Sequence, residues 1–202
     1  MVGMDKVIRL QNVAKIISGY QFRNDSLELS SGDWKFIQMR DVDSDNMIIP
    51  DSVIDVDLSL KESSVDKYLL KIGDILFKNR GAKNGAALYD LGWPKTIASH
   101  QFLVIRLIDA GIIPEYLVWY INSETARLYF RQQAVGSTTL LVQKRTLEEL
   151  EVIVPPIDVQ KNIIKIQSFY RREKNLIERR MQLKSKYIDN VLSEYLNSMR
   201  KV

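Results

Sequence analysis

The chain has 202 residues, of which 46% are hydrophobic and 27% charged, a balance that excludes a disordered chain and suits one globular domain with or without an appendage. It contains no cysteine and one histidine, which excludes disulfides, thiol nucleophiles, cysteine-based zinc sites and two-histidine catalytic centres. The net charge of +4 and the pI near 9.1 raise the question of nucleic-acid binding, which depends on where the charge lies.

Short strands dominate the first half of the chain. The N-terminus alternates polar and apolar residues, unlike a signal peptide, and no apolar run approaches the ~20 residues of a membrane span. We therefore expect a cytoplasmic protein with no membrane contact. Alternation predicts a strand over residues 34–39, and β-forming residues predict strands over 74–78 and 102–107. Between the last two, residues 79–85 hold two glycines, two asparagines and two bases, which is typical of a loop.

The second half of the body contains a predicted helix and a last strand. Pro114, followed by an acid, indicates a helix start, and Gly136 indicates a stop, so we expect one helix over residues 114–134. A short strand is expected over 151–154. Many short strands, few helices and no regular βαβ alternation predict a mixed α+β body.

The C-terminal region is different in kind. From Ile157 to Met199 there is neither glycine nor proline, which predicts one continuous helix about 65 Å long. Its apolar residues recur every 11 positions, a spacing that keeps a stripe on one face of a nearly straight helix. We expect this stripe to pair with another long helix rather than to fold back on the body. The predicted pairing residues are Ile166, Tyr170, Ile177, Met181, Ile188 and Leu192. The predicted domains are residues 1–154 and 155–202.

The charge is unevenly distributed between these parts. Residues 155–202 hold 11 Lys+Arg and 5 Asp+Glu, whereas residues 1–154 hold 18 and 20, so the net charges are +6 and −2. Within the body, residues 41–66 carry −7, residues 67–106 carry +5 and residues 127–145 carry +4. Any affinity of the body for DNA must therefore come from its two basic segments.

No motif in the sequence indicates catalysis or a metal centre. There is no phosphate-binding P-loop, dinucleotide fingerprint or nucleophile elbow. Asp41, Asp43 and Asp45 alternate like the first ligands of a calcium loop, but the glycine and the distal glutamate of that loop are missing. We therefore expect a solvated acidic loop there, and we assign no catalytic residue, metal ligand or cofactor to the chain.

Several polar residues of the basic segments are suited to contacting DNA. Arginine and lysine neutralise phosphates, arginine can also bind guanine, asparagine can bind adenine, and glycine lets a phosphate approach the backbone. His100, at the head of a strand, could equally donate to DNA or cap the strand. The candidate DNA-binding residues are Lys78, Arg80, Lys83, Asn84, Ser99, His100, Thr138, Thr139 and Lys144.

Several short runs follow one another in a distinctive order along nearly the whole chain. They are residues 10–16 followed by Gly19, then 70–76, 80–85, 114–117, 122–123, 136–137, 147–150, Pro155-Pro156 and Gln160. In this order and spacing they resemble the DNA-specificity (S) subunit of type I restriction–modification systems.

The resemblance implies a target recognition domain followed by a long conserved helix. In that family the domain reads half of a split site in the major groove of double-stranded DNA, and the helix packs against a second helix as a spacer. The subunit is not an enzyme. It docks methyltransferase (M) subunits, which use S-adenosylmethionine to methylate adenine, and restriction (R) subunits join them. The cofactors S-adenosylmethionine, Mg²⁺ and ATP are expected only in those partner subunits.

Two departures from the family pattern bear on assembly. Family members usually carry two recognition domains and two helices, whereas this chain has one of each and is similar to a half-subunit. The helix start usually reads Pro-Pro-x-x-Glu-Gln, and here Val159 replaces the glutamate. We expect two copies to pair their helices antiparallel as a homodimeric coiled coil, which would read a site with inverted-repeat halves. Pairing with a different half-subunit is the alternative.

Two other classes of protein stay open at this point. A helical scaffold without a DNA role would use the long helix alone, and salt-dependent binding to duplex DNA would distinguish it. A recognition fragment of a nuclease or methyltransferase would carry catalysis. The Asn/Asp-Pro-Pro-aromatic motif of adenine methyltransferases is missing, because Pro155-Pro156 lies between Val154 and Ile157.

Overall fold

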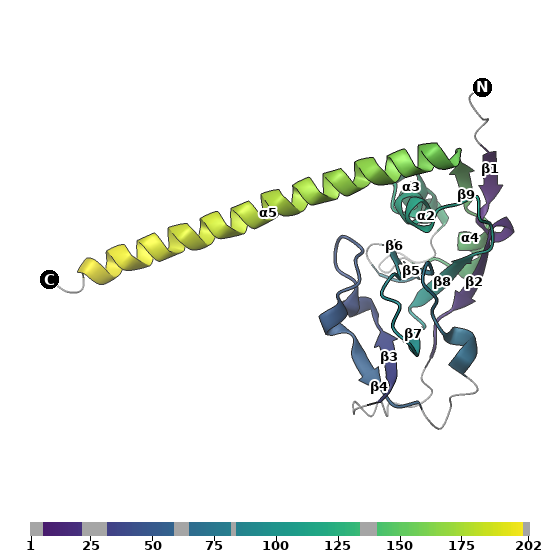
Figure 1. Cartoon of the computed structure of the whole chain (residues 1–202), viewed down its shortest axis with the longest axis horizontal. Helices are drawn as coiled ribbons and strands as arrows, with labels where there is room; N and C mark the ends of the chain where they lie inside the picture. Colours follow the sequence, from purple (N-terminus) through teal and green to yellow (C-terminus); the bar gives the residue numbers. More distant parts are fainter. Residues whose placement is uncertain (1–5, 22–31, 59–64, 82–83, 134–140, 200–202) are drawn as a thin grey trace. The chain divides into compact units, whose positions relative to one another are not determined.

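The chain divides into two compact units, Met1–Lys161 and Asn162–Val202, in a computed structural model of all 202 residues (Figure 1). The described residues are 6–21, 32–58, 65–81, 84–133 and 141–199. The first unit mixes strands with short helices, and the described residues of the second belong to one long helix, so the predicted α+β class with a long C-terminal helix is confirmed. The first unit extends past the predicted boundary at residue 154 to include the first turn of that helix.

The largest sheet of the described residues has four strands in the order β2-β8-β5-β6. The strands are β2 (Ala14–Ser18), β8 (Phe102–Leu107), β5 (Ile75–Lys78) and β6 (Gly85–Leu88). Neighbouring strands are antiparallel throughout. The central strands β5 and β8 are buried on both faces, which explains why each is a continuous apolar run rather than an alternating one.

Two smaller sheets complete the described strands. One has the order β4-β3-β7, formed by β4 (Ile54–Val56), β3 (Trp34–Ile37) and β7 (Thr96–Ala98), with β3 parallel to β7. The other pairs β1 (Lys6–Arg9) with β9 (Glu151–Val154) antiparallel. This pairing joins the beginning of the body to its end.

Strand β3 contributes to two separate apolar clusters. Ile37 packs with Leu76 and Phe102 of the four-stranded sheet, whereas Trp34 and Phe36 pack in a second cluster around β4 and β7. Side chains alternate across a strand, so the alternating sequence of β3 places these residues on opposite faces. The strand therefore connects the two parts of the core.

The helix predicted over residues 114–134 is wrong in one respect, because it is two helices. The helices before β9 are α2 (Pro114–Ile121), α3 (Glu124–Gln133) and α4 (Lys144–Glu148), and the 3₁₀ turns are η1 (Leu10–Asn12), η2 (Met39–Asp41), η3 (Pro50–Ser52) and η5 (Asp66–Tyr68). The helix is interrupted at Asn122-Ser123, where the Ser123 hydroxyl accepts a hydrogen bond from the backbone N–H of Ala126. Leu128, in the second of the two helices, is 49% exposed.

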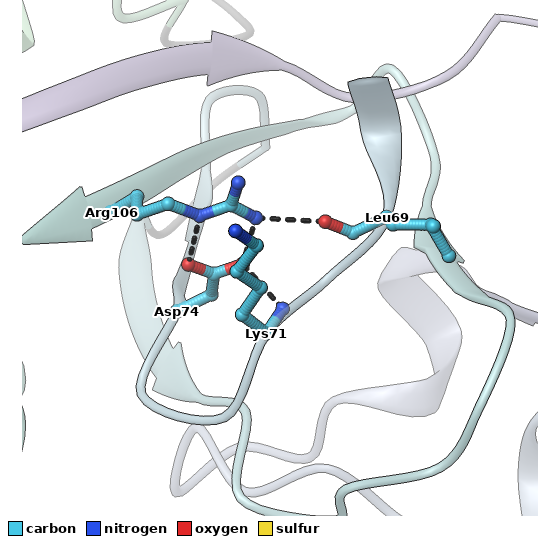
Figure 2. A network of polar contacts seen from close by, with 4 residues as sticks. All are labelled: Leu69, Lys71, Asp74 and Arg106. Carbon is cyan, nitrogen blue, oxygen red and sulfur yellow. Dashed lines mark hydrogen bonds and ion pairs between the residues drawn. The ribbon is translucent and has the colours of Figure 1, made fainter. Parts of the chain in front are cut away.

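A buried ion pair fixes the turn that leads into β5. The Arg106 guanidinium, from β8, donates to both carboxylate oxygens of Asp74, at 2.8 Å and 2.6 Å, and also to the carbonyl of Leu69 (Figure 2). The backbone N–H of Lys71 donates to the same carboxylate at 2.8 Å (Figure 2). Hydrogen bonding to Asp74 raises the pKa of Arg106. The network lies directly before the first residue of β5, and its polar groups bind one another, which indicates a structural role.

The long helix α5 runs from Ile157 to Met199, as predicted. No helix in the described part of the chain is long and apolar enough to cross a membrane. The six predicted stripe residues are exposed by 45% to 69% in the structure of one chain. The helix thus presents an uncovered apolar face.

Candidate nucleic-acid interface

The described candidate DNA-binding residues of the loop and of the turn before β8 lie at one end of the four-stranded sheet. Strand pairing places Lys78, the last residue of β5, beside both Gly85 of β6 and Phe102 of β8. The backbone N–H of Asn79 donates to the carbonyl of Gln101 at 3.2 Å. The start of the loop after β5 and the turn before β8 are therefore neighbours, although Asn79 and Gln101 lie 22 residues apart in sequence.

A third segment reaches the same end from the C-terminal side. The backbone N–H of Val142 donates to the carbonyl of Asn79 at 2.9 Å. Lys144, two residues further on, begins α4 and is exposed, with its ammonium 3.5 Å from Glu148. Three separate parts of the sequence thus meet here, and we call their described residues 78–81, 84, 99–101 and 141–144 the loop edge.

The side chains of the loop edge differ in what they can contact. Arg80 and His100 are exposed. Asn84 is half-buried and its side-chain amide donates to the carbonyl of Lys78 at 3.0 Å, so one of its donors is already used within the body. Ser99 is only 4% exposed, and its hydroxyl has no hydrogen-bond partner among the described residues. The predicted residues Lys83, Thr138 and Thr139 lie outside the described residues.

Lys78 is the half-buried cation of the loop edge. Its ammonium lies 3.4 Å from the backbone carbonyl of Asp43, in the connection between β3 and β4. Burial lowers the pKa of Lys78 from its usual 10.5, and the negative charge of Asp43 offsets part of that effect. The positive charge is therefore held in place beside an acidic turn rather than extended into solvent.

The acidic turn itself differs from the expected solvated loop. Asp41 is fully buried, and its carboxylate accepts the backbone N–H of Gln38 at 2.7 Å, capping η2. Asp43 accepts the backbone N–H groups of Asp45 and Met47 at 2.9 Å and 2.8 Å, which closes a local turn. The expectation of three solvated carboxylates was therefore wrong for Asp41. No three metal-ligating side chains gather anywhere in the described ranges.

Asn122 was not predicted as part of this region. It supports the loop edge through hydrogen bonds to β6, the strand that follows the loop. Its amide accepts the N–H of Ala86 at 3.0 Å and donates to the carbonyl of Ala86 at 2.8 Å, so it completes the ladder of the outer strand β6. It also accepts a hydrogen bond from Asn46 at 3.2 Å. A Cβ on Gly85 would lie 2.4 Å from the Asn46 side-chain oxygen, so a larger residue there would displace the Asn46 amide. The signal in the sequence was the polar pair Asn122-Ser123 interrupting an apolar helix.

Gln160 anchors the first turn of α5 within the first unit. Its side chain is fully buried, accepts the N–H of Ile113 at 2.9 Å, and donates to the carbonyls of Gly111 and Pro155 at 2.9 Å and 2.8 Å. Both its donor and acceptor capacity are used, which is what a buried amide requires. The only sequence signal for it was its place after Pro155-Pro156.

Comparisons with known proteins agree on one family. The family model described as the type I restriction modification DNA specificity domain matches residues 2–184. A Methanocaldococcus jannaschii protein named as the specificity subunit of the type I restriction enzyme MjaX is 27% identical over 150 residues, covering 68% of this chain and 35% of that protein.

Solved structures show the same fold. The S subunit of a type I restriction–modification system from M. genitalium gives a TM-score of 0.57 at 16% identity, covering 87% of this chain and 41% of that one. The HsdS subunit from Thermoanaerobacter tengcongensis gives a TM-score of 0.62 at 18% identity, covering 85% and 43%. The chain therefore spans less than half the length of these relatives. By the match of its sequence over residues 2–184, the chain belongs to the family of type I restriction modification DNA specificity domains.

Proposed function

We propose that this chain is a DNA-specificity component of a type I restriction–modification system and reads half of a bipartite site in double-stranded DNA. The observation that carries the proposal is the loop edge. There, three separate segments of the body bring Lys78, Arg80, His100 and Lys144 to one end of the four-stranded sheet. Membership of the family indicates DNA as the ligand, and the loop edge is the surface that we propose binds it.

The residues of the loop edge have different proposed roles. Arg80 is exposed and has the bidentate donors that recognise guanine, so it reads a base edge. Lys78 and Lys144 contribute positive charge that attracts phosphates. The buried residue Ser99 supports the exposed residues around it. The Asn84 amide acts through its hydrogen bond to the Lys78 carbonyl. The candidates Lys83, Thr138 and Thr139 belong to the same proposal.

The proposed partners supply the chemistry. The chain itself is non-catalytic and acts in the cytoplasm, where it directs methyltransferase subunits to adenines in its site. Those subunits would bind S-adenosylmethionine, and restriction subunits would add the Mg²⁺- and ATP-dependent activities. The exposed stripe of α5 pairs with the helix of a second copy. The two bodies, each with its proposed boundary near residue 155, then bind the two half-sites.

Binding to duplex DNA tests the proposal directly. The chain, purified with its methyltransferase subunit, is titrated against labelled duplexes at several salt concentrations while fluorescence anisotropy is recorded. We expect the logarithm of the binding constant to fall linearly with the logarithm of salt concentration, by about 0.9 per phosphate neutralised. We also expect one duplex sequence to bind more tightly than shuffled sequences. Binding that depends on neither salt nor sequence would favour the helical scaffold instead.

A further inference from the structure

Charged side chains interrupt the apolar stripe of α5. Two rows of the stripe begin at Ile166 and Tyr170 and repeat every 11 residues. A third row, three residues after Tyr170, holds Glu173 and then, 11 residues later, Lys184. Because the three rows together keep a spacing of about 3.67 residues per turn, these charges lie on the same face as the apolar residues.

A shallow hollow on this face brings charges and apolar residues together. Its lining includes Tyr170, Glu173, Ile177 and Arg180. Glu173 and Arg180 are exposed, and neither has an ion-pair partner among the described residues. They lie seven residues apart, about 10 Å along the axis, which is too far for a pair within one helix. Each can therefore pair with an opposite charge on another chain.

Symmetry limits how two copies of this face can meet. In an antiparallel pair with a twofold axis, a residue that precedes the axis position by some number of residues faces the residue of the other copy that follows the axis position by the same number. The three rows coincide with those of a second copy if the axis lies at Ile177 or at steps of about 5.5 residues from it. Axes as far out as Ile166 or Ile188 leave much of each helix unpaired, so the axes to compare are Ile177 and the steps next to it. With the axis at Ile177, Ile166 faces Ile188 of the second copy, and Tyr170 faces Lys184.

Charge distinguishes between these arrangements. With the axis at Ile177, Glu173 of each copy lies beside Arg180 of the other, so two symmetric ion pairs can form. An axis between residues 171 and 172 brings arginine against arginine, and an axis between residues 182 and 183 brings Arg180 beside a lysine. A parallel pair in register would oppose Glu173 to Glu173 and Arg180 to Arg180. Of these four arrangements, only the antiparallel pair with its axis at Ile177 matches both the apolar rows and the charges.

We infer that two copies of this chain pair antiparallel through α5 with the twofold axis at Ile177, in a register fixed by reciprocal Glu173–Arg180 ion pairs. The inference rests on the proposed pairing of two copies and adds its register. The axis lies 20 residues from Ile157 in each copy, so the two helix starts are about 60 Å apart along the pair. The register thus sets how far apart the helices begin.

Disulfide trapping in the full chain measures this register. The chain has no cysteine, so single cysteine variants give an unambiguous signal. We expect Ile177→Cys to form a disulfide-linked dimer by itself, because this residue faces its own copy across the axis. Ile166→Cys and Ile188→Cys should not link alone but should link to each other when mixed. A parallel pair would instead link each of these two variants to its own copy.

The outcomes distinguish the register from the pairing itself. Sedimentation of the unmodified chain at increasing concentration reports whether it dimerises at all, and a monomer throughout would overturn the proposed pairing. A dimer in which Ile177→Cys does not link, while cysteines elsewhere on the stripe do, would overturn only the register. Dimerisation with the expected linking pattern supports both.

A charge exchange tests the ion pairs. Arg180→Glu breaks two pairs and opposes like charges, so we expect the dimer dissociation constant to rise about tenfold. Adding Glu173→Arg to the same chain recreates both pairs with reversed signs and should return the constant to within about threefold of the original. Arg179→Glu is the matched control, since it changes the same charge off the stripe. Equal effects of Arg179→Glu and Arg180→Glu would contradict the register.

Discussion

The guanidinium of Arg106 binds the carboxylate of Asp74 through two hydrogen bonds, with side-chain exposures of only 24% and 2% (Figure 2). Removing one partner of a buried pair leaves the other charge uncompensated, which typically costs about 3–5 kcal/mol. We therefore expect Asp74→Ala to lower the free energy of unfolding by about 3 kcal/mol in urea denaturation.

The matched control for this change is a more exposed ion pair of the same body. The Lys35 ammonium lies 2.6 Å from the Asp55 carboxylate, and the two side chains are 35% and 45% exposed. Exposed pairs contribute about 0.2–1 kcal/mol, so Asp55→Ala should have a small effect. Equal losses for Asp55→Ala and Asp74→Ala would show that burial does not govern the Asp74 pair.

Gln160→Ala should loosen the start of α5. The change leaves the N–H of Ile113 and the carbonyls of Gly111 and Pro155 without their side-chain partner, at a cost of about 1–3 kcal/mol for each group that stays dry. We expect lower thermal stability and faster hydrogen exchange at the Ile113 amide. Gln182→Ala, on an exposed position of the same helix, is the control and should change neither. Unchanged exchange at Ile113 would contradict the anchoring role.

Asn122→Asp tests whether the loop edge depends on its support. An aspartate can still accept from the Ala86 N–H, but it cannot donate to the Ala86 carbonyl and places a carboxylate against it. We expect DNA affinity to fall several-fold because strand β6 and the adjoining loop lose their fixed position. Ser123→Ala, next to it, should weaken the α3 cap by about 1 kcal/mol yet leave DNA binding unchanged. Loss of affinity in both variants alike would indicate a general loss of folding instead.

Arg80→Ala should weaken specific binding by about 1–3 kcal/mol and flatten the discrimination between DNA sites. The reason is that an arginine reading a base contributes mainly to the preferred sequence. Anisotropy titrations with the preferred and a shuffled duplex measure both effects. Lys15→Ala, which removes an exposed lysine side chain of β2, is the control and should leave the ratio of the two affinities unchanged. A uniform loss on both duplexes in Arg80→Ala would instead assign Arg80 to phosphate contact.

The sequence was sufficient where one local signal decided the structure. The strand Glu151–Val154 and the helix Ile157–Met199 have the predicted limits, because composition alone separates them from their surroundings. The break at Asn122-Ser123 was missed although this polar pair marks it, whereas the hydrogen bonds of Asn122 to β6 could not be predicted because they join residues 36 apart in sequence. The pairing of β1 with β9 was missed for the same reason, since short strands do not specify distant partners.

The candidate site was predictable in its residue types but not in its assembly. A basic, glycine-rich loop after Lys78 could be identified from composition. That the segment at Val142 would join it through Asn79 could not, because a backbone hydrogen bond between loops leaves no pattern in the sequence. Burial of Ser99 was equally unpredictable, since it depends on packing against segments of the body that are distant in sequence.

Mapping of methylated adenines across the cell's DNA, with and without this protein, measures whether the protein directs methylation to a DNA site. We expect a split motif with inverted-repeat halves to lose its methylation when the protein is absent and to regain it when the protein is restored. Restoration with Arg80→Ala should yield reduced or relaxed methylation of that motif. An unchanged set of methylated motifs in the absence of the protein would contradict a role in DNA specificity.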